Sequence, residues 1–183
     1  FNCLTVFGLL TASDWLTDLP KTVSRQRQRQ VRRVAEEARS CGMKLLYGLG
    51  VYSWGFDQII EADPAVRGPN PHAMCASRDE SRRWMEKVVD YLLAEFRFDG
   101  FHLEASDLGR CTCPRCTPQG NTEYYSRLNT QTARYIRSRQ PNAVLMVNMC
   151  GYLPWGTTTP RADWPPRVEL GRHRAFLIDA GPA

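Results

Sequence analysis

The chain has no run of about 18 apolar residues, the length that a membrane-spanning helix requires. We therefore expect no transmembrane segment. Its 183 residues, 43% hydrophobic and 23% charged, are enough for one globular domain with a sizeable core. The apolar start, 1–10, lacks the basic region and the small-residue cleavage site of a signal peptide. We interpret it as a β-strand.

Two nucleotide-binding motifs are also absent. No Gly-x-Gly-x-x-Gly follows the first candidate strand and no P-loop pattern occurs, which argues against a dinucleotide-binding fold. A basic run at 25–33 carries much of the net charge of +5, but no aromatic residues lie between its arginines. Because single-strand binders stack bases on such aromatics, we interpret the run as the solvated face of a helix and expect no nucleic-acid partner.

Cysteine is plentiful, but its count of seven is odd. An odd count does not suit a closed disulfide framework, and a chain of this size does not need one. Four cysteines are scattered along the chain, and three lie close together in one loop. Reduced thiols in a cytosol-like compartment are the favoured interpretation.

The apolar pattern alternates between strand-like and helix-like periods. Strands are predicted at 3–10, 43–49, 101–103 and 143–148, with helices at 24–40, 78–96 and 122–139. This order is typical of parallel βα units. The predicted fold class is α/β, a (β/α)8 TIM-barrel-like architecture. The barrel is expected to be incomplete, with about four to five βα units, because a full barrel needs about 250 residues.

This pattern also sets the predicted boundaries. Residues 1–156 would form the partial barrel, and 157–183 an irregular tail rich in Pro and Thr with a candidate last strand at 174–179. Two helix ends carry local signals. Gly42 suits a left-handed C-cap, and Ser77 with Glu80 three residues later predicts a capping box at the start of the second helix.

The most informative segment is 98–116, where a short buried strand leads into Glu104 and Asp107. Side chains alternate along a strand, so Phe101 and Leu103 would face the helices. His102 and Glu104 would then face the barrel axis, with Glu104 at the carboxyl end of the strand, where barrels do their chemistry. The alternative is that Glu104 caps the next helix or pairs with a nearby arginine.

Two carboxylates at one barrel mouth suit the hydrolysis of a glycosidic bond. One donates a proton to the leaving oxygen, and the other stabilises positive charge or activates water. We therefore predict Glu104 as general acid or acid/base and Asp107 as the assisting carboxylate. A non-catalytic, carbohydrate-binding barrel is the alternative.

Other side chains near the predicted mouth could hold a sugar. Tyr52 and Trp54 follow the second strand, and their rings could stack on sugar faces or pack on the barrel rim. Asn148 ends the last clear strand and could bind a hydroxyl group or cap a loop. The substrate-binding candidates are His102, Tyr52, Trp54, Asn148 and Arg110.

The loop after Glu104 places Cys111, Cys113 and Cys116 within six residues. A closed zinc site needs four ligands, and only three are local. The fourth could come from one of four side chains: Cys75, Cys150, His72 or His102. Spacing does not choose among them, so we favour a metal-free braced loop and assign no metal or other cofactor. A zinc-stabilised interaction module is kept as an alternative.

Three stretches carry a resemblance to a known family: 48–56, 73–77 and 99–107 before the cysteine loop. Together they resemble bacterial barrel glycosidases of the α-glucuronidase-like and β-N-acetylhexosaminidase-like kind, over about 31–152. The resemblance implies a barrel fold, a carbohydrate substrate and carboxylate catalysis. Such hexosaminidases carry an adjacent Asp-Glu pair after a strand, whereas here the order is Glu104-Ala-Ser-Asp107, so the pair is not reproduced.

Overall fold

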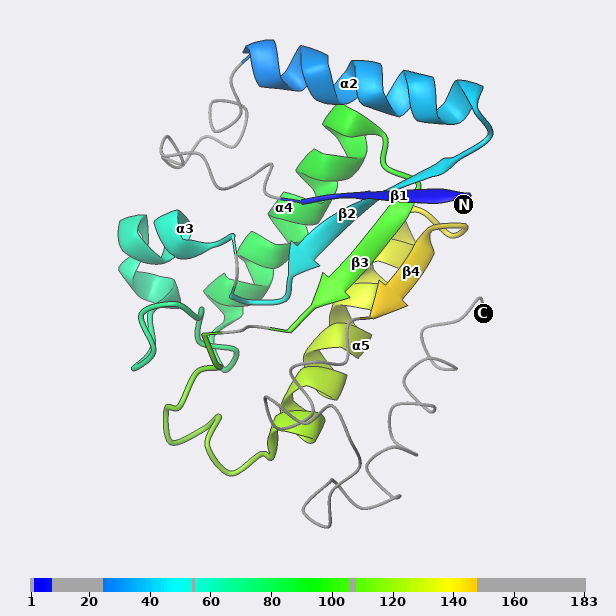
Figure 1. The fold of residues 1–183 in the computed structure, drawn as a ribbon. Helices are drawn as coiled ribbons and strands as arrows, with labels where there is room; N and C mark the ends of the chain where they lie inside the picture. Colours follow the sequence, from blue (N-terminus) through cyan, green and yellow to red (C-terminus); the bar gives the residue numbers. More distant parts are fainter. Residues whose placement is uncertain (1, 8–24, 54, 106–107, 148–183) are drawn as a thin grey trace.

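The computed structural model describes residues 2–7, 25–53, 55–105 and 108–147 (Figure 1). Its elements run in the order β1 (Cys3–Val6), α2 (Arg25–Ser40), β2 (Lys44–Gly50), α3 (Asp57–Ala62), η1 (Pro64–Val66), α4 (Asp79–Phe96), β3 (Gly100–Glu104), α5 (Asn121–Arg139) and β4 (Val144–Val147). The predicted strands and helices are confirmed within these residues. The short helices α3 and η1 were not predicted. The proposed tail at 157–183 lies outside the described residues.

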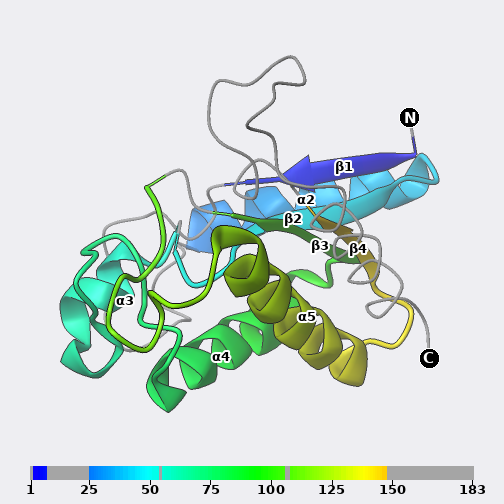
Figure 2. The ribbon, with the colours of Figure 1, turned by 90° about the horizontal axis from the view of Figure 1, so that it is seen from below.

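The four strands form one parallel sheet in sequence order, β1-β2-β3-β4. Helices α2, α4 and α5 all lie on the same side of this sheet (Figure 2). A dinucleotide-binding sheet reverses its strand order and carries helices on both faces. Sequential order with helices on one side is instead the winding of a (β/α) barrel, and four strands are about half of the eight that close one.

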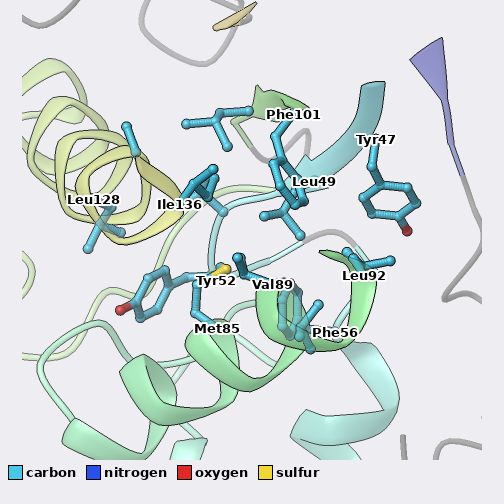
Figure 3. Close-up of a cluster of buried hydrophobic side chains, with 14 of the residues drawn as sticks. Tyr47, Leu49, Tyr52, Phe56, Met85, Val89, Leu92, Phe101, Leu128 and Ile136 are labelled. Atoms are coloured by element: carbon cyan, nitrogen blue, oxygen red, sulfur yellow. The ribbon is translucent and has the colours of Figure 1, made fainter. Parts of the chain in front are cut away.

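The core fills the space between the sheet and the helices. Figure 3 shows side chains of β2, β3, α4 and α5 pointing toward one another in this layer. Phe101 and Leu103 are fully buried there, as the alternation of side chains predicted. The amphipathic stripe of α2 also packs into the core, through Val31, Ala35 and Ala38.

Glycine shapes two places in this layer. Gly42 follows α2 with φ of +71°, so the predicted left-handed C-cap is confirmed. Gly100 begins β3, and a Cβ added there would lie 1.8 Å from the backbone oxygen of Val144. Only a residue without a side chain therefore allows β3 and β4 to approach at this point.

Helix α4 begins differently from the capping-box prediction. Its N-cap is Arg78, and no side chain makes a capping hydrogen bond, so the prediction that Ser77 caps the helix is wrong. The Ser77 hydroxyl instead lies 3.1 Å from the sulfur of Cys75 and 3.7 Å from that of Cys113. The serine thus contacts two cysteines, and the capping-box pattern gave no indication of this contact.

None of the helices in the described part of the chain is both long and apolar enough to span a membrane.

Candidate functional site

The candidate site lies on the sheet face opposite the helix layer. In the parallel register, Gly48 of β2 pairs with His102 of β3, and Gly50 pairs with Glu104. Paired residues in neighbouring strands point to the same side, so two glycines lie beside the two polar side chains. Within the described residues, no helix covers this face (Figure 2). His102 and Glu104 thus face what would be the interior of a closed barrel, as predicted.

His102 and Glu104 contact each other directly. Nδ1 of His102 lies 3.2 Å from Oε1 of Glu104, and the two side chains are 20% and 14% exposed. A half-buried carboxylate beside an imidazole is oriented by it and remains accessible to a ligand. This pair provides a group that can donate or accept a proton at the carboxyl end of a strand.

An aromatic ring limits the site on its β1 side. The ring of Phe7 meets that of His102 edge to face, with centroids 6.0 Å apart. Phe7 also lies over Gly48, where an added Cβ would be 2.1 Å from the ring. The absence of a side chain at Gly48 therefore makes room for the aromatic ring that packs against His102.

Tyr52 does not lie at this face. It follows β2 in a left-handed conformation, with φ of +63°, and its side chain is 3% exposed. Figure 3 shows it beside Met85, in the layer between α4 and α5. With Thr132 and other residues of the two helices it lines a pocket of about 320 Å³ on the helix side. This position supports a role in the core and gives no support for sugar binding at the mouth.

Arg110 is occupied within its own loop. Its guanidinium group donates to Oδ1 of Asn121 at 2.8 Å and to the backbone oxygens of Cys116 and Gln119. The same group lies 5.0 Å from the ring centroid of Tyr124. These contacts attach the β3–α5 loop to the start of α5, which supports a structural role for Arg110 over substrate binding.

Three predicted site residues, Trp54, Asp107 and Asn148, lie outside the described residues. Their assignments remain predictions. Phe56, which follows Trp54 closely in the sequence, is buried in the hydrophobic core.

The cysteine loop gains a fourth member from a distant segment. The sulfurs of Cys75, Cys111, Cys113 and Cys116 all lie within 4.8 Å of one another. Cys75 was one of four candidates in the sequence, where spacing could not select it. Three of the four side chains are buried, and Cys113 is half-buried.

The environment of each thiol affects its ionisation. Burial raises the pKa of the Cys111 and Cys116 thiols. Burial also acts to raise the pKa of Cys113, but hydrogen bonds from Ser77 and from the backbone of Cys116 and Arg115 outweigh it and lower that pKa to about 6. One sulfur of the group is therefore held in surroundings that favour the thiolate.

No protein-family model matches this sequence, and no curated protein matches it. Solved structures with a similar fold include an α-amylase from Anoxybacillus, with a TM-score of 0.55 and 13% identity over 80% of this chain and 36% of that enzyme. An α-amylase from Geobacillus thermoleovorans, complexed with acarbose, has a TM-score of 0.55 and 12% identity over 80% and 36%. A β-N-acetylhexosaminidase from Bacteroides fragilis has a TM-score of 0.53 and 15% identity over 77% and 31%.

At these low sequence identities, the similarity shows a shared fold alone. The chain spans about a third of the length of the enzymes that it resembles. Its sheet and its one-sided helix layer are those of part of a (β/α) barrel, the fold of these solved structures.

Proposed function

We propose that this chain forms part of a glycoside hydrolase and that Glu104 is its general acid or acid/base. The observation that carries the proposal is the position of Glu104, at the carboxyl end of β3, on the face without helices and in contact with His102. In (β/α) barrels the residues that react lie at this end of the strands. The similarity in fold to α-amylases and a β-N-acetylhexosaminidase supports the same assignment.

The chemistry requires a carboxylic acid to protonate the glycosidic oxygen while positive charge develops on the sugar ring. Glu104 is 14% exposed, so bound sugar would exclude most of the water that remains around it. His102 would hold the carboxyl group in one orientation through its Nδ1 contact. Asp107, three residues later, would stabilise the positive charge or activate water.

The substrate proposed is a carbohydrate of the type cleaved by α-glucuronidase-like or β-N-acetylhexosaminidase-like enzymes of bacteria. The sequence resemblance to these enzymes supports this choice. Trp54 and Asn148 are proposed as further sugar contacts. Because Glu104 and Asp107 are not adjacent, we propose direct acid catalysis by Glu104, without the adjacent Asp-Glu pair of those hexosaminidases.

The test uses the protein that carries this chain and a panel of aryl glycosides that includes N-acetylglucosaminides and glucuronides. Glu104→Gln should lower kcat/KM by about 10²- to 10⁴-fold, the usual contribution of general acid–base catalysis. Glu36→Gln on the exposed side of α2 makes the same chemical change away from the site and should retain full activity. Equal activity of Glu104→Gln and wild type would contradict the assignment.

A second candidate function is carbohydrate binding without hydrolysis. It is favoured by Gly50, which pairs with Glu104 and adds no side chain beside it, so a sugar could lie against this face without being cleaved. It predicts that calorimetry detects sugar binding while no glycoside in the panel is cleaved. Cleavage that depends on Glu104 would exclude it.

A further inference from the structure

The four-cysteine group joins two loops that follow neighbouring strands. Cys75 lies in the segment between β2 and α4, whereas Cys111, Cys113 and Cys116 lie in the loop between β3 and α5. We propose that these four thiolates bind one zinc ion in a tetrahedral structural site, which fastens together the two loops that follow β2 and β3.

The sulfur positions fit a single ion. Zinc–sulfur bonds of about 2.3 Å in a tetrahedron place the sulfurs about 3.8 Å apart. The sulfurs of Cys75 and Cys113 lie 3.6 Å apart, and all four lie within 4.8 Å of one another. An iron–sulfur cluster would hold its thiolates farther apart, since several metal and sulfide ions would lie between them. Four sulfurs without nitrogen or oxygen ligands favour zinc among single divalent ions.

Hydrogen bonds around the sulfurs are suited to thiolates. The backbone of Arg115 and of Cys116 donates to the Cys113 sulfur, and the backbone of Cys113 donates to the Cys111 sulfur. The Ser77 hydroxyl, 3.1 Å from the sulfur of Cys75, can also donate to it. Such partners orient ligands and spread the negative charge of a metal–thiolate centre.

The surroundings provide both space and charge for the centre. Gly68 lies against it, and a Cβ added there would be 2.6 Å from the Cys111 sulfur. Gly68 also lines a cavity together with Arg67, Arg78 and Arg115 and with two of the cysteines, Cys75 and Cys113. Zinc with four thiolates carries two negative charges, which the positive charge of the arginines that line this cavity would partly offset.

Binding involves no oxidation or reduction. Each thiol that becomes a ligand releases its proton to solvent, and four zinc–sulfur bonds form. The ion connects residues 38 positions apart in the sequence, since the sulfurs of Cys75 and Cys113 become ligands of one metal. The result is a fixed spacing between the β2 and β3 loops at the carboxyl end of the sheet, whether or not Glu104 is catalytic.

The test begins with the wild-type protein, purified under reducing conditions without a metal-binding tag. Elemental analysis should find about one zinc per chain, and X-ray absorption at the zinc edge should find four sulfurs at about 2.3 Å. Cobalt exchanged into the site should give the intense visible bands of tetrahedral cobalt–thiolate coordination. These measurements need no variant, so they hold even if a substitution prevents folding.

Variants then identify the ligands. Cys75→Ser should lose most of the bound zinc, whereas Cys41→Ser, at an exposed cysteine outside the group, should keep it. Cys113→His, at the most exposed ligand, should retain zinc with three sulfurs and one nitrogen, because Cys3His sites are also stable. Wild-type protein without stoichiometric zinc, with iron in its place, or with a disulfide among these cysteines would overturn the proposal. These outcomes are independent of glycosidase activity.

Discussion

Nδ1 of His102 lies 3.2 Å from Oε1 of Glu104, two residues further along the same strand. The contact follows from strand geometry, since residues two apart point to the same face. It makes His102 a positioning partner for the carboxyl group that we propose as the catalytic acid. Of the two glycines that pair with these residues, Gly48 has its space filled by the Phe7 ring, whereas Gly50 adds no side chain beside Glu104.

Replacement of His102 by leucine should lower kcat/KM by about 10- to 100-fold, because a hydrogen bond to a charged group contributes about 1.5–3 kcal/mol. Met146→Leu is the matched control, since Met146 pairs with His102 in the register and is exposed. If His102 acts through Glu104, the double variant with Glu104→Gln should be no slower than Glu104→Gln alone. Independent, multiplied losses would contradict this role.

Two substitutions of Tyr52 distinguish a role in the hydrophobic core from a role in sugar binding. Because its ring is buried between α4 and α5, Tyr52→Phe should leave kcat/KM unchanged. Tyr52→Ala should lower the free energy of unfolding by about 3–5 kcal/mol, the range for deleting a large buried ring. Denaturant unfolding and aryl-glycoside assays measure the two effects. A specific rise in KM for Tyr52→Phe would restore the sugar-binding interpretation.

Tyr52 also gives a prediction at alkaline pH. Burial raises its pKa from 10.0 to about 12, with smaller effects from neighbouring charges that include Arg82. Because the folded pKa lies above the unfolded one, this contribution to stability is complete below pH 10 and is lost as the pH rises through about 12. Wild type should therefore lose more stability than Tyr52→Phe between those pH values. Parallel curves for the two proteins in urea unfolding would contradict the assigned burial.

The strand faces could be predicted from the sequence, but the position of Tyr52 could not. Phe101 points toward the helices, whereas His102 and Glu104 point to the opposite face, because side chains alternate along a strand with a period of two. That local rule holds throughout β3. At Tyr52 the backbone turns left-handed, so the alternation of β2 does not extend to it. A positive φ at a residue other than glycine is uncommon, and nothing in the sequence around Tyr52 predicts one there.

The cysteine group shows a second limit of local patterns. Cys111, Cys113 and Cys116 are neighbours in the sequence and were recognised as a group. Cys75 reaches them only because parallel strands bring the carboxyl ends of β2 and β3 to the same edge of the sheet. Spacing along the chain carries no information about that contact, so sequence alone left the fourth ligand open.

Gly68 should be required for the four-cysteine site. An alanine Cβ would lie 2.6 Å from the Cys111 sulfur, so Gly68→Ala should lower the free energy of unfolding by about 1–3 kcal/mol and weaken zinc retention. Gly120→Ala is the control, because nothing lies within 4 Å of a Cβ at that position. Zinc retention against a competing chelator and thermal unfolding measure both effects. Indistinguishable behaviour of the two variants would show that the loop adjusts freely.

Substitutions of Ser77 test whether its hydroxyl group caps helix α4 or supports the cysteine ligands of the proposed metal. A capping serine stabilises its helix with or without metal, and its replacement by alanine costs about 0.5–2 kcal/mol. Here the hydroxyl lies beside the sulfurs of Cys75 and Cys113, so Ser77→Ala should weaken zinc binding by about 10- to 100-fold, as loss of an outer partner typically does. The stability of the zinc-free protein should be almost unchanged. A loss of stability that is equal with and without zinc would instead support capping, and Ser77→Thr, which keeps a hydroxyl group, should retain the wild-type affinity for zinc.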